Sequence, residues 1–224
     1  LDQPNLSTAL VVVVIFLVMI YVAKISYKWI GGALALLIPF GVWFIFAIQQ
    51  EGQKLLEPYQ VNRIMSWFDP AKYPVDNTQQ QMNSIMAIGS GQLWGKGLSN
   101  TEIASVKNGN FLIEEQTDFI FAIVGEEMGF AGAMAVLALI LLIVFECLLM
   151  ANRARDLSGR LICVGMATLF AFQSFANIAV ATAIFPNTGL PLPLISYGVS
   201  SLLSIYMGMG VVLNVGLQRK FNNE

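Results

Sequence analysis

Five long apolar stretches restrict the fold of this chain more than any other feature. A helix needs roughly 20 mostly apolar residues to cross the hydrocarbon core of a membrane, and all five stretches reach or approach that length. Their residues do not alternate between polar and apolar, as the strands of an outer-membrane barrel do. The stretches are residues 6–23, 29–48, 128–150, 161–185 and 201–217. We therefore predict an all-α polytopic membrane protein with about five transmembrane helices.

The composition agrees with a membrane protein. The 224 residues are 56% hydrophobic and only 12% charged, which is too little polar surface for an ordinary soluble domain. The net charge of −2 comes without a basic patch, so we predict no nucleic-acid partner. Cys147 and Cys163 lie in apolar stretches without metal-binding spacing, and we interpret both as packing residues.

The basic residues between the stretches predict the orientation. Seven of them fall on one side of the membrane, and segments 1–5 and 186–200 on the other side carry none. Basic loops usually face the cytoplasm, so we expect the N-terminus of this chain outside and its C-terminus inside. The seven residues are Lys24, Lys28, Arg153, Arg155, Arg160, Arg219 and Lys220.

A long polar segment then lies outside the membrane. Residues 1–48 would hold the first two transmembrane helices, residues 49–117 a large extracellular loop, and residues 118–224 the last three helices and a short cytoplasmic tail. Long loops inside a compact domain usually bind or catalyse. This one contains an amphipathic pattern over residues 79–88, followed by the glycine-rich sequence GSGQLWGKGL. The chain opens with LDQPN and shows no cleavable signal, so we expect a piece of a longer protein.

Five carboxylates surround an apolar run in the sequence EEQTDFIFAIVGEE, residues 114–127. Ionisable groups in or near a membrane are costly and mark functional candidates. Asp118 begins a helical stripe of small residues at 122, 125 and 129, which permits close approach of a helix or a ligand. The chain has no histidine, so a carboxylate is its ordinary general base. Asp118 as a helix cap or first-turn acid, and Glu126 and Glu127 as groups reaching the membrane surface, remain the alternatives.

Five ordered blocks resemble the second half of the shape, elongation, division and sporulation (SEDS) family, of RodA and FtsW type. The resemblance covers essentially the whole chain. The blocks are QPNLSTA (3–9), NRIMSWFDP (62–70), MAIGSGQLWGKGL (86–98), EEQTDFIFAIVGEEMGF (114–130) and NTGLPLPLISYGVSSL (187–202). It implies a ten-helix bacterial glycosyltransferase of the cytoplasmic membrane that polymerises lipid II into peptidoglycan strands, in cell-shape, division or sporulation wall synthesis. It also implies that Asp118 is the essential acid.

The chain departs from the family pattern at several positions. Asn5 and Ser7 stand where the family usually has Asp and Gly, and Gln116 stands where His is usual. Val199 replaces a glycine in the ISYGGSS block, and valine would hinder a positive φ if the backbone needed one there. These departures leave the fold assignment intact and bear on activity.

The resemblance and the chemistry together predict the site. Asp118 would accept the proton of the attacking sugar hydroxyl, and cations or amides would stabilise the leaving pyrophosphate. For Arg63 and Lys96 the alternative is a solvated loop charge. The sequence NTGLPLPLISYGVSS would line the groove for the lipid substrate or, alternatively, form a hairpin packed for its own sake. The predicted substrate-binding residues are Arg63, Gln80, Lys96, Thr117, Glu126, Ser196 and Ser200.

Cofactors, partners and alternative functions complete the prediction. Carboxylates without histidine would suit Mg²⁺ or Mn²⁺, but no ligand spacing indicates a metal. The expected partners are lipid II, the membrane and a class B penicillin-binding protein, by resemblance. The alternatives to a polymerase are a lipid II flippase and a non-catalytic membrane scaffold for a transpeptidase; the gathering of carboxylates on the outer side favours the enzyme.

Overall fold

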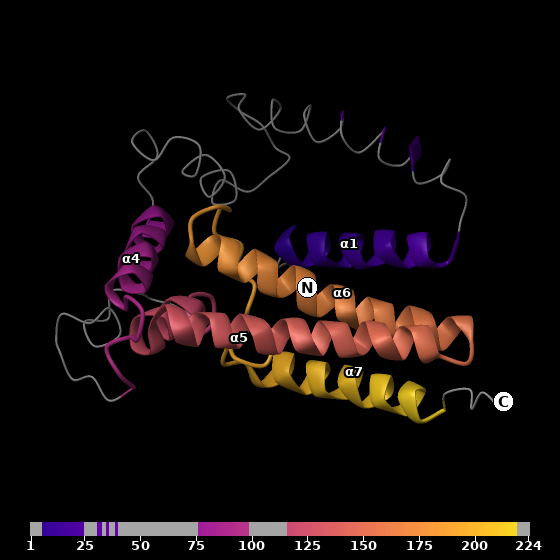
Figure 1. The fold of residues 1–224 in the computed structure, drawn as a ribbon. Helices are drawn as coiled ribbons and strands as arrows, with labels where there is room; N and C mark the ends of the chain where they lie inside the picture. Colours follow the sequence, from indigo (N-terminus) through magenta and orange to yellow (C-terminus); the bar gives the residue numbers. More distant parts are fainter. Residues whose placement is uncertain are drawn as a thin grey trace.

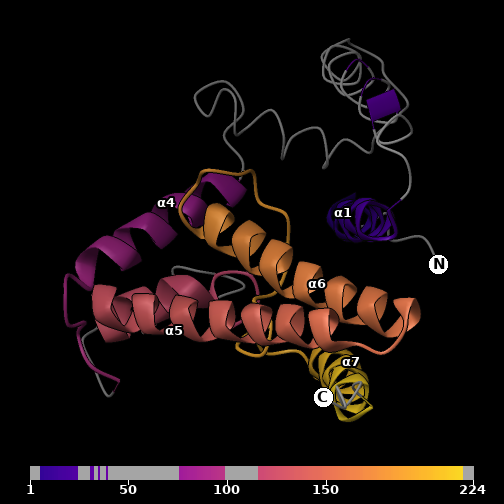
Figure 2. The same cartoon turned by 45° about the vertical axis from the view of Figure 1, so that its right-hand side comes forward.

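The computed structural model describes residues 6–24, 31, 32, 35, 39, 76–98 and 116–218. In this part of the chain the main elements are five helices: α1 (Leu6–Val22), α4 (Asp76–Ser90), α5 (Ile120–Arg153), α6 (Leu157–Ala181) and α7 (Val199–Leu217). Helices α1, α5, α6 and α7 run side by side along their lengths, and α4 lies across one end of them (Figure 1). Figure 2 shows α4 next to the beginning of α5 and the end of α6.

Helix α6 is the centre of the bundle. It packs against α1 on one side and against α5 and α7 on the other. A cluster of small and branched side chains fills the contact between α5, α6 and α7, and the two cysteines belong to it with free thiols. The predicted packing role of Cys147 and Cys163 is therefore confirmed. The buried members are Cys147, Ala151, Cys163, Val164, Ala167 and Val212.

Three helices of the described chain are long and apolar enough to cross a membrane: α5, α6 and α7. Helix α1 is apolar but has only 17 residues, and the stretch 29–48 lies almost entirely outside the described residues. In the described residues the all-helical architecture, with helices long and apolar enough to cross a membrane, is thus confirmed, and the number of five spans stays a prediction. Leu139, Phe145 and Leu203 are each more than half exposed, which suits contact with lipid or with further helices.

The helix boundaries differ from the predicted ones because hydropathy does not detect caps. Helix α6 begins at Leu157, where the carboxylate of Asp156 accepts a hydrogen bond of 3.3 Å from the backbone N–H of Gly159. Such a cap satisfies one of the free donors at a helix start. Helix α5 begins at Ile120, eight residues before the predicted stretch, and continues to Arg153 with a break at Gly129.

Helix α4 confirms the amphipathic helix expected at 79–88. Its buried face carries polar side chains together with Ala87, and several of its apolar side chains are exposed. The last carbonyl groups of a helix have no partner within that helix, and α4 supplies donors at the end of α6. Gln81 Nε2 donates to the carbonyls of Val180 (3.2 Å) and Phe185 (2.7 Å), and Ser84 Oγ donates to Ala181 (2.7 Å). Met82 and Met86 face outward, each 60% exposed.

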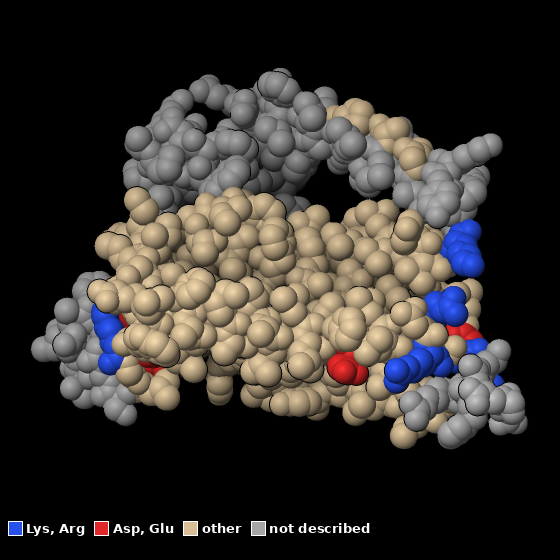
Figure 3. All heavy atoms as spheres, viewed as in Figure 1, with Lys and Arg blue, Asp and Glu red and all other residues tan. Residues whose placement is uncertain are grey.

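The charged side chains gather at the two ends of the bundle. Figure 3 shows a largely uncharged band, with one acidic group inside it, and Lys and Arg concentrated beyond it at one end. That end holds the turn between α5 and α6, with Arg153, Arg155 and Arg160. The opposite end holds Lys96, Asp118 and Glu126, close to where α5 begins. The basic residues between α5 and α6 thus lie at one end of the bundle, and the orientation prediction places this end in the cytoplasm.

Candidate functional site

Asp118 lies in the turn 116–119 that leads into α5. Phe119 is the N-cap residue of α5 and its side chain makes no capping hydrogen bond, while the first turn of the helix contains no acid. Asp118 is therefore neither the N-cap residue nor a first-turn acid of α5, and that interpretation is wrong. Its side chain is partly buried, so it stands outside the helix at a position shaped by neighbouring segments.

Three groups from distant parts of the chain hold this turn by its carbonyl oxygens. Asn177 in α6 donates from Nδ2 to Asp118 O at 2.8 Å. Ser196 donates from Oγ to Thr117 O at 2.6 Å, and the N–H of Tyr197 donates to Gln116 O at 2.8 Å. Each residue of the Gln-Thr-Asp sequence thus has its backbone tied to α6 or to the segment before α7. The position of Asp118 is defined by hydrogen bonds that span 59 to 81 residues of sequence (177 − 118 and 197 − 116).

The segment 182–198, which we name the proline loop, lies beside Asp118. A Cβ on Gly189 would stand 3.4 Å from Asp118 Oδ2, so the backbone of the loop approaches the carboxylate directly. Gly189 has φ of 67°, a conformation that favours glycine. Leu190 and Leu192 are buried, and Asn177 Nδ2 donates to Leu190 O at 2.7 Å as well. The loop is therefore built around the Asp118 turn, which supports the interpretation as part of a site over that of a self-contained hairpin.

Lys96 and Glu126 form the ion pair of a second cluster. Lys96 Nζ lies 2.7 Å from Glu126 Oε1, and the side chain of Glu126 is only 1% exposed while that of Lys96 is 23% exposed. Lys96 is therefore not a solvated loop charge, and Glu126 does not reach the membrane surface; both of those alternatives are wrong. The carboxylate is buried because the segment 91–97, which we name the glycine strap, crosses α5 at this point and brings the ammonium group to it.

The glycine strap supplies hydrogen-bond partners where α5 is broken. Gly129 has φ of 66° and ψ of −167°, so the hydrogen bonds that would join 130 to 126 and 131 to 127 in a regular helix are not made. The strap supplies a partner for each of these four groups. Phe130 N donates to Gln92 O (2.8 Å), Ala131 N to Leu93 O (3.1 Å), Lys96 N to Glu126 O (2.9 Å) and Gly97 N to Glu127 O (2.9 Å).

The small-residue stripe on α5 has a clear use. Ala122, Gly125 and Gly129 are all buried. A Cβ on Gly125 would press on Ile88 of α4, and one on Gly91 would overlap the carbonyl oxygen of Gly125. The stripe therefore receives α4 and the glycine strap, which is the close approach of another segment that its spacing predicts.

The structure divides the predicted site residues into separate groups. Thr117, Asp118 and Ser196 lie together, and Lys96 and Glu126 bind each other. Gln80 is buried on α4, with 9% exposure. Ser200 is exposed in the first turn of α7, where its carbonyl accepts from Ser204 Oγ at 2.8 Å. Arg63 lies outside the described residues. The substrate-binding roles of all seven residues stay predictions.

Asn177 is the residue of this site that the sequence interpretation missed. It is 1% exposed near the end of the apolar helix α6 and links the Asp118 turn to the proline loop. A buried amide in an apolar span is a signal in itself, because buried polar groups need partners. The sequence interpretation used the apolar residues around Asn177 to identify the span and did not consider this single polar residue within it.

No metal site emerges in the part of the chain that the structure describes. There, no group of three or more Asp, Glu or Cys side chains is close enough to share a metal ion. The expectation of Mg²⁺ or Mn²⁺ therefore has no assigned ligands and stays a prediction.

The chain matches known proteins over nearly its whole length. The family model FTSW_RODA_SPOVE, described as "Cell cycle protein", matches residues 1–221. The chain is 34% identical over 220 residues to the peptidoglycan glycosyltransferase MrdB of Escherichia coli K12, which covers 97% of this chain and 56% of that protein. It is 36% identical over 219 residues to the stage V sporulation protein E of Bacillus subtilis, covering 98% and 56%. The chain thus spans about half the length of the curated relatives it matches.

A solved structure shares the fold. It is described as "Structural coordination of polymerization and crosslinking by a peptidoglycan synthase complex", and the matching chain has a TM-score of 0.67 and 31% sequence identity. The match covers 98% of this chain and 58% of the other. Both the sequences and the folds therefore point to one family.

Proposed function

Because this chain belongs to the FtsW, RodA and SpoVE family of cell cycle proteins, we propose that the full-length protein polymerises lipid II into peptidoglycan glycan strands. The relatives named as peptidoglycan glycosyltransferases support this activity. The observation that carries the proposal for this chain is the Asp118 turn, whose carbonyls are held by Asn177, Ser196 and Tyr197. These bonds fix the backbone that carries the carboxylate, and a general base has to be positioned in this way to reach the proton that it accepts.

The reaction joins a sugar hydroxyl of one substrate to the anomeric carbon of another. The hydroxyl oxygen forms the new glycosidic bond, the bond from the anomeric carbon to the lipid pyrophosphate breaks, and the pyrophosphate leaves with the electron pair. Asp118 accepts the hydroxyl proton as the oxygen attacks, for which its carboxylate has to come within about 3 Å of that oxygen. Gly189 leaves room beside the carboxylate, since a larger residue there would add atoms 3.4 Å from Oδ2.

The charge on the leaving pyrophosphate needs cations or backbone N–H groups. Lys96 is the candidate among the described residues, and Arg63 is the candidate from the remainder of the extracellular segment. Since Glu126 already neutralises much of the Lys96 charge through their 2.7 Å contact, Lys96 would serve the pyrophosphate only by sharing its donors between the two. We assign it first to the stability of the strap and second to the substrate.

Membrane placement and partners follow from the same family. We propose that the chain crosses the bacterial cytoplasmic membrane five times, with its N-terminus outside, its C-terminus in the cytoplasm and Asp118 at the outer face. The basic end of the bundle supports this orientation. A similar chain belongs to a peptidoglycan synthase complex that coordinates polymerization and crosslinking, so we propose a class B penicillin-binding protein as the partner.

The test is the synthesis of glycan strands from lipid II by the purified full-length protein and its Asp118→Asn variant. Asparagine keeps the size of the side chain but cannot accept the proton, so polymer formation should fall by about 10²- to 10⁴-fold. Glu127→Asn is a suitable control, because Glu127 is a partly buried acid nine residues further along the same segment.

Two results would contradict the proposal. Polymer from Asp118→Asn at near the normal rate would remove the general base, and it would favour the flippase or the scaffold. Absence of polymer from the wild-type protein, with its transpeptidase partner present, would also favour the flippase or the scaffold. Thermal unfolding of each variant shows whether a loss of activity is a loss of folding.

A further inference from the structure

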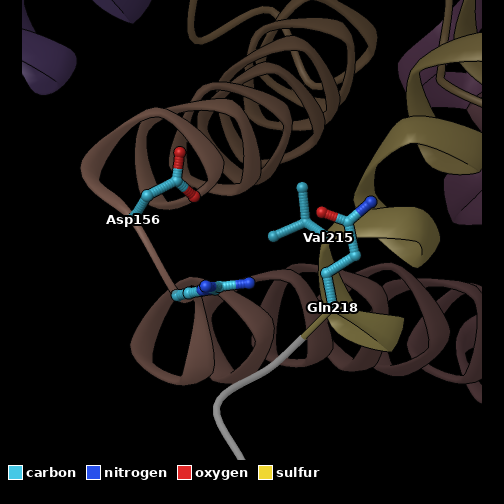
Figure 4. Close-up of a pocket in the computed structure, with 4 residues that line it drawn as sticks. Asp156, Val215 and Gln218 are labelled. Carbon is cyan, nitrogen blue, oxygen red and sulfur yellow. The ribbon is translucent and has the colours of Figure 1, made fainter.

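A cleft of about 410 Å³ opens at the end of the bundle opposite to Asp118. Arg155 and Asp156 line it from the turn between α5 and α6, and Val215 and Gln218 line it from the end of α7. Figure 4 shows Asp156 on one wall, with Val215 and Gln218 facing it across the opening. Its volume lies within the range of about 300 to 1,000 Å³ that small-molecule sites occupy.

The position of the cleft along the helix axes indicates which molecules surround it. Helix α5 ends at Arg153, α6 begins at Leu157 and α7 ends at Leu217, so the cleft stands where all three membrane-length helices terminate. Figure 3 shows that this end also carries the concentration of Lys and Arg beyond the uncharged band. The polar headgroup layer of a bilayer begins where the apolar spans end. The cleft therefore lies among lipid headgroups.

The walls of the cleft carry both charges. Arg155 offers a planar guanidinium group, which pairs with phosphate through two parallel hydrogen bonds. Asp156 offers a carboxylate: its Oδ1 accepts from Gly159 N at 3.3 Å, and a carboxylate has about four acceptor positions in all. The amide of Gln218 is oriented by a 2.6 Å hydrogen bond from its Nε2 to Asn214 Oδ1, and Val215 gives an apolar wall.

We propose that this cleft binds the headgroup of a membrane phospholipid that carries both a phosphate and a primary amine, as in phosphatidylethanolamine. Arg155 binds the phosphate and Asp156 binds the ammonium group. The formal charges of Arg155 and Asp156 cancel, as do those of such a headgroup. A headgroup that carries a phosphate without an amine would place its negative charge near the carboxylate of Asp156, which repels it. A quaternary amine has no N–H group to donate to that carboxylate.

The test is lipid binding by the purified full-length protein, measured by native mass spectrometry. The probes are phosphatidylethanolamine, phosphatidylcholine and phosphatidylglycerol with identical acyl chains, and soluble phosphoethanolamine. We expect one phosphatidylethanolamine to bind more tightly than either other lipid and than the soluble headgroup. Arg155→Gln should weaken that binding about tenfold, or about 1.4 kcal/mol.

Two variants separate a site from general charge attraction. Arg153→Gln removes the same charge from the end of α5, outside the lining of the cleft, and should change the affinity by less than about twofold because its side chain does not line the cleft. Asp156→Asn keeps the cap of α6, and it should abolish the preference for phosphatidylethanolamine over phosphatidylcholine.

Several outcomes would overturn the proposal. Equal losses from Arg153→Gln and Arg155→Gln would mean diffuse attraction without a site. Tighter binding of phosphatidylglycerol than of phosphatidylethanolamine would exclude the amine, and equal binding of soluble phosphoethanolamine would exclude the lipid as the source. An Asp156→Asn variant that folds and keeps the full preference would remove the role of its carboxylate.

Discussion

The glycine strap and the proline loop both lie against the beginning of α5, but they hold it by different means. The strap uses backbone groups: four backbone hydrogen bonds join 92, 93, 96 and 97 to the broken turn at Gly129, with one ion pair added. At the proline loop, side chains do most of the work, through the amide of Asn177 and the hydroxyl of Ser196. The backbone bond from Tyr197 N to Gln116 O adds to them there.

This difference predicts how each region fails. A backbone network needs close approach, so it tolerates many side-chain changes but no Cβ at its contact points. A side-chain network loses one specific bond with each substitution, and its backbone survives. Changes in the strap should therefore reduce folding, whereas changes around the proline loop should displace Asp118 in a protein that still folds.

The largest effect is expected from Gly95→Ala in the strap. Gly95 has φ of 78°, and a Cβ there would overlap the carbonyl oxygen of Glu127 and the backbone N of Gly129. A strained conformation and a steric overlap each cost about 1–3 kcal/mol, so the full-length protein should lose several kcal/mol of stability. Thermal unfolding in detergent measures it.

Gly97→Ala is the matched control for that variant. Gly97 has φ of 94° but no atom within 4 Å of the position of a Cβ, so alanine suffers only from the conformation. It should be clearly more stable than Gly95→Ala. Equal losses for the two would show that the overlap with α5 is of no importance, and the backbone account of the strap would be wrong.

The second effect concerns the ion pair of the strap. Lys96→Met removes the cation that lies 2.7 Å from the buried carboxylate of Glu126. Breaking a buried pair costs about 3–5 kcal/mol, and the 23% exposure of Lys96 reduces the expected loss to about 2–3 kcal/mol. The double variant Lys96→Met with Glu126→Met should recover most of it, because apolar groups can replace both partners. A double-mutant cycle on unfolding temperatures measures the coupling.

The Lys96→Met variant also distinguishes a structural role of Lys96 from a role in substrate binding. If Lys96→Met leaves stability unchanged but lowers the rate of glycan synthesis, Lys96 serves the substrate more than the strap. The ion pair would then not be what keeps α5 in place.

The sequence predicted the helices far better than it predicted these contacts. The apolar stretches placed α7 within two residues at its start, and they placed the cores of α5 and α6, because span length and hydropathy are local properties. The pairing of Lys96 with Glu126 spans 30 residues and depends on the break at Gly129, which no local pattern encodes. The burial of Gln81 and Ser84 on α4 has the same origin, since their partners are the last carbonyls of α6.

The candidate site was predicted in part. Asp118 stood out as a carboxylate within an apolar segment, and Thr117 and Ser196 were named and lie together with it. Ser200 was named with Ser196 because both belong to the same sequence block, although one is buried and the other exposed. A motif identifies a segment, but burial and hydrogen bonds decide what each residue in the segment does.

A third prediction tests the two serines against each other. Ser196 is 4% exposed, and its hydroxyl accepts from Leu192 N at 2.7 Å and donates to Thr117 O. Ser196→Ala leaves a buried N–H without its partner, which costs about 1–3 kcal/mol, and should lower the polymerisation rate about tenfold, or by about 1.4 kcal/mol of barrier, as the Asp118 turn shifts. Ser200→Ala should change the rate by less than about twofold, as exposed polar substitutions usually have small effects. Equal rates for the two variants would contradict the role of the side-chain network.

The smallest effect is expected from Val199→Gly. The sequence indicated that valine would hinder a positive φ if the backbone needed one at this position, but Val199 is the first residue of α7 and is not among the described residues with positive φ. The backbone has no such need here, because the extended residue before it, Gly198, makes the turn into the helix. Val199 is 72% exposed, so glycine removes little packing and costs at most about 1 kcal/mol of helix stability. We expect glycan synthesis within about twofold of the normal rate, which is about 0.4 kcal/mol of barrier, and a slightly lower unfolding temperature. A loss above about tenfold would mean that the valine contacts a group the reaction needs, and a gain above about tenfold would mean that backbone freedom limits the reaction after all.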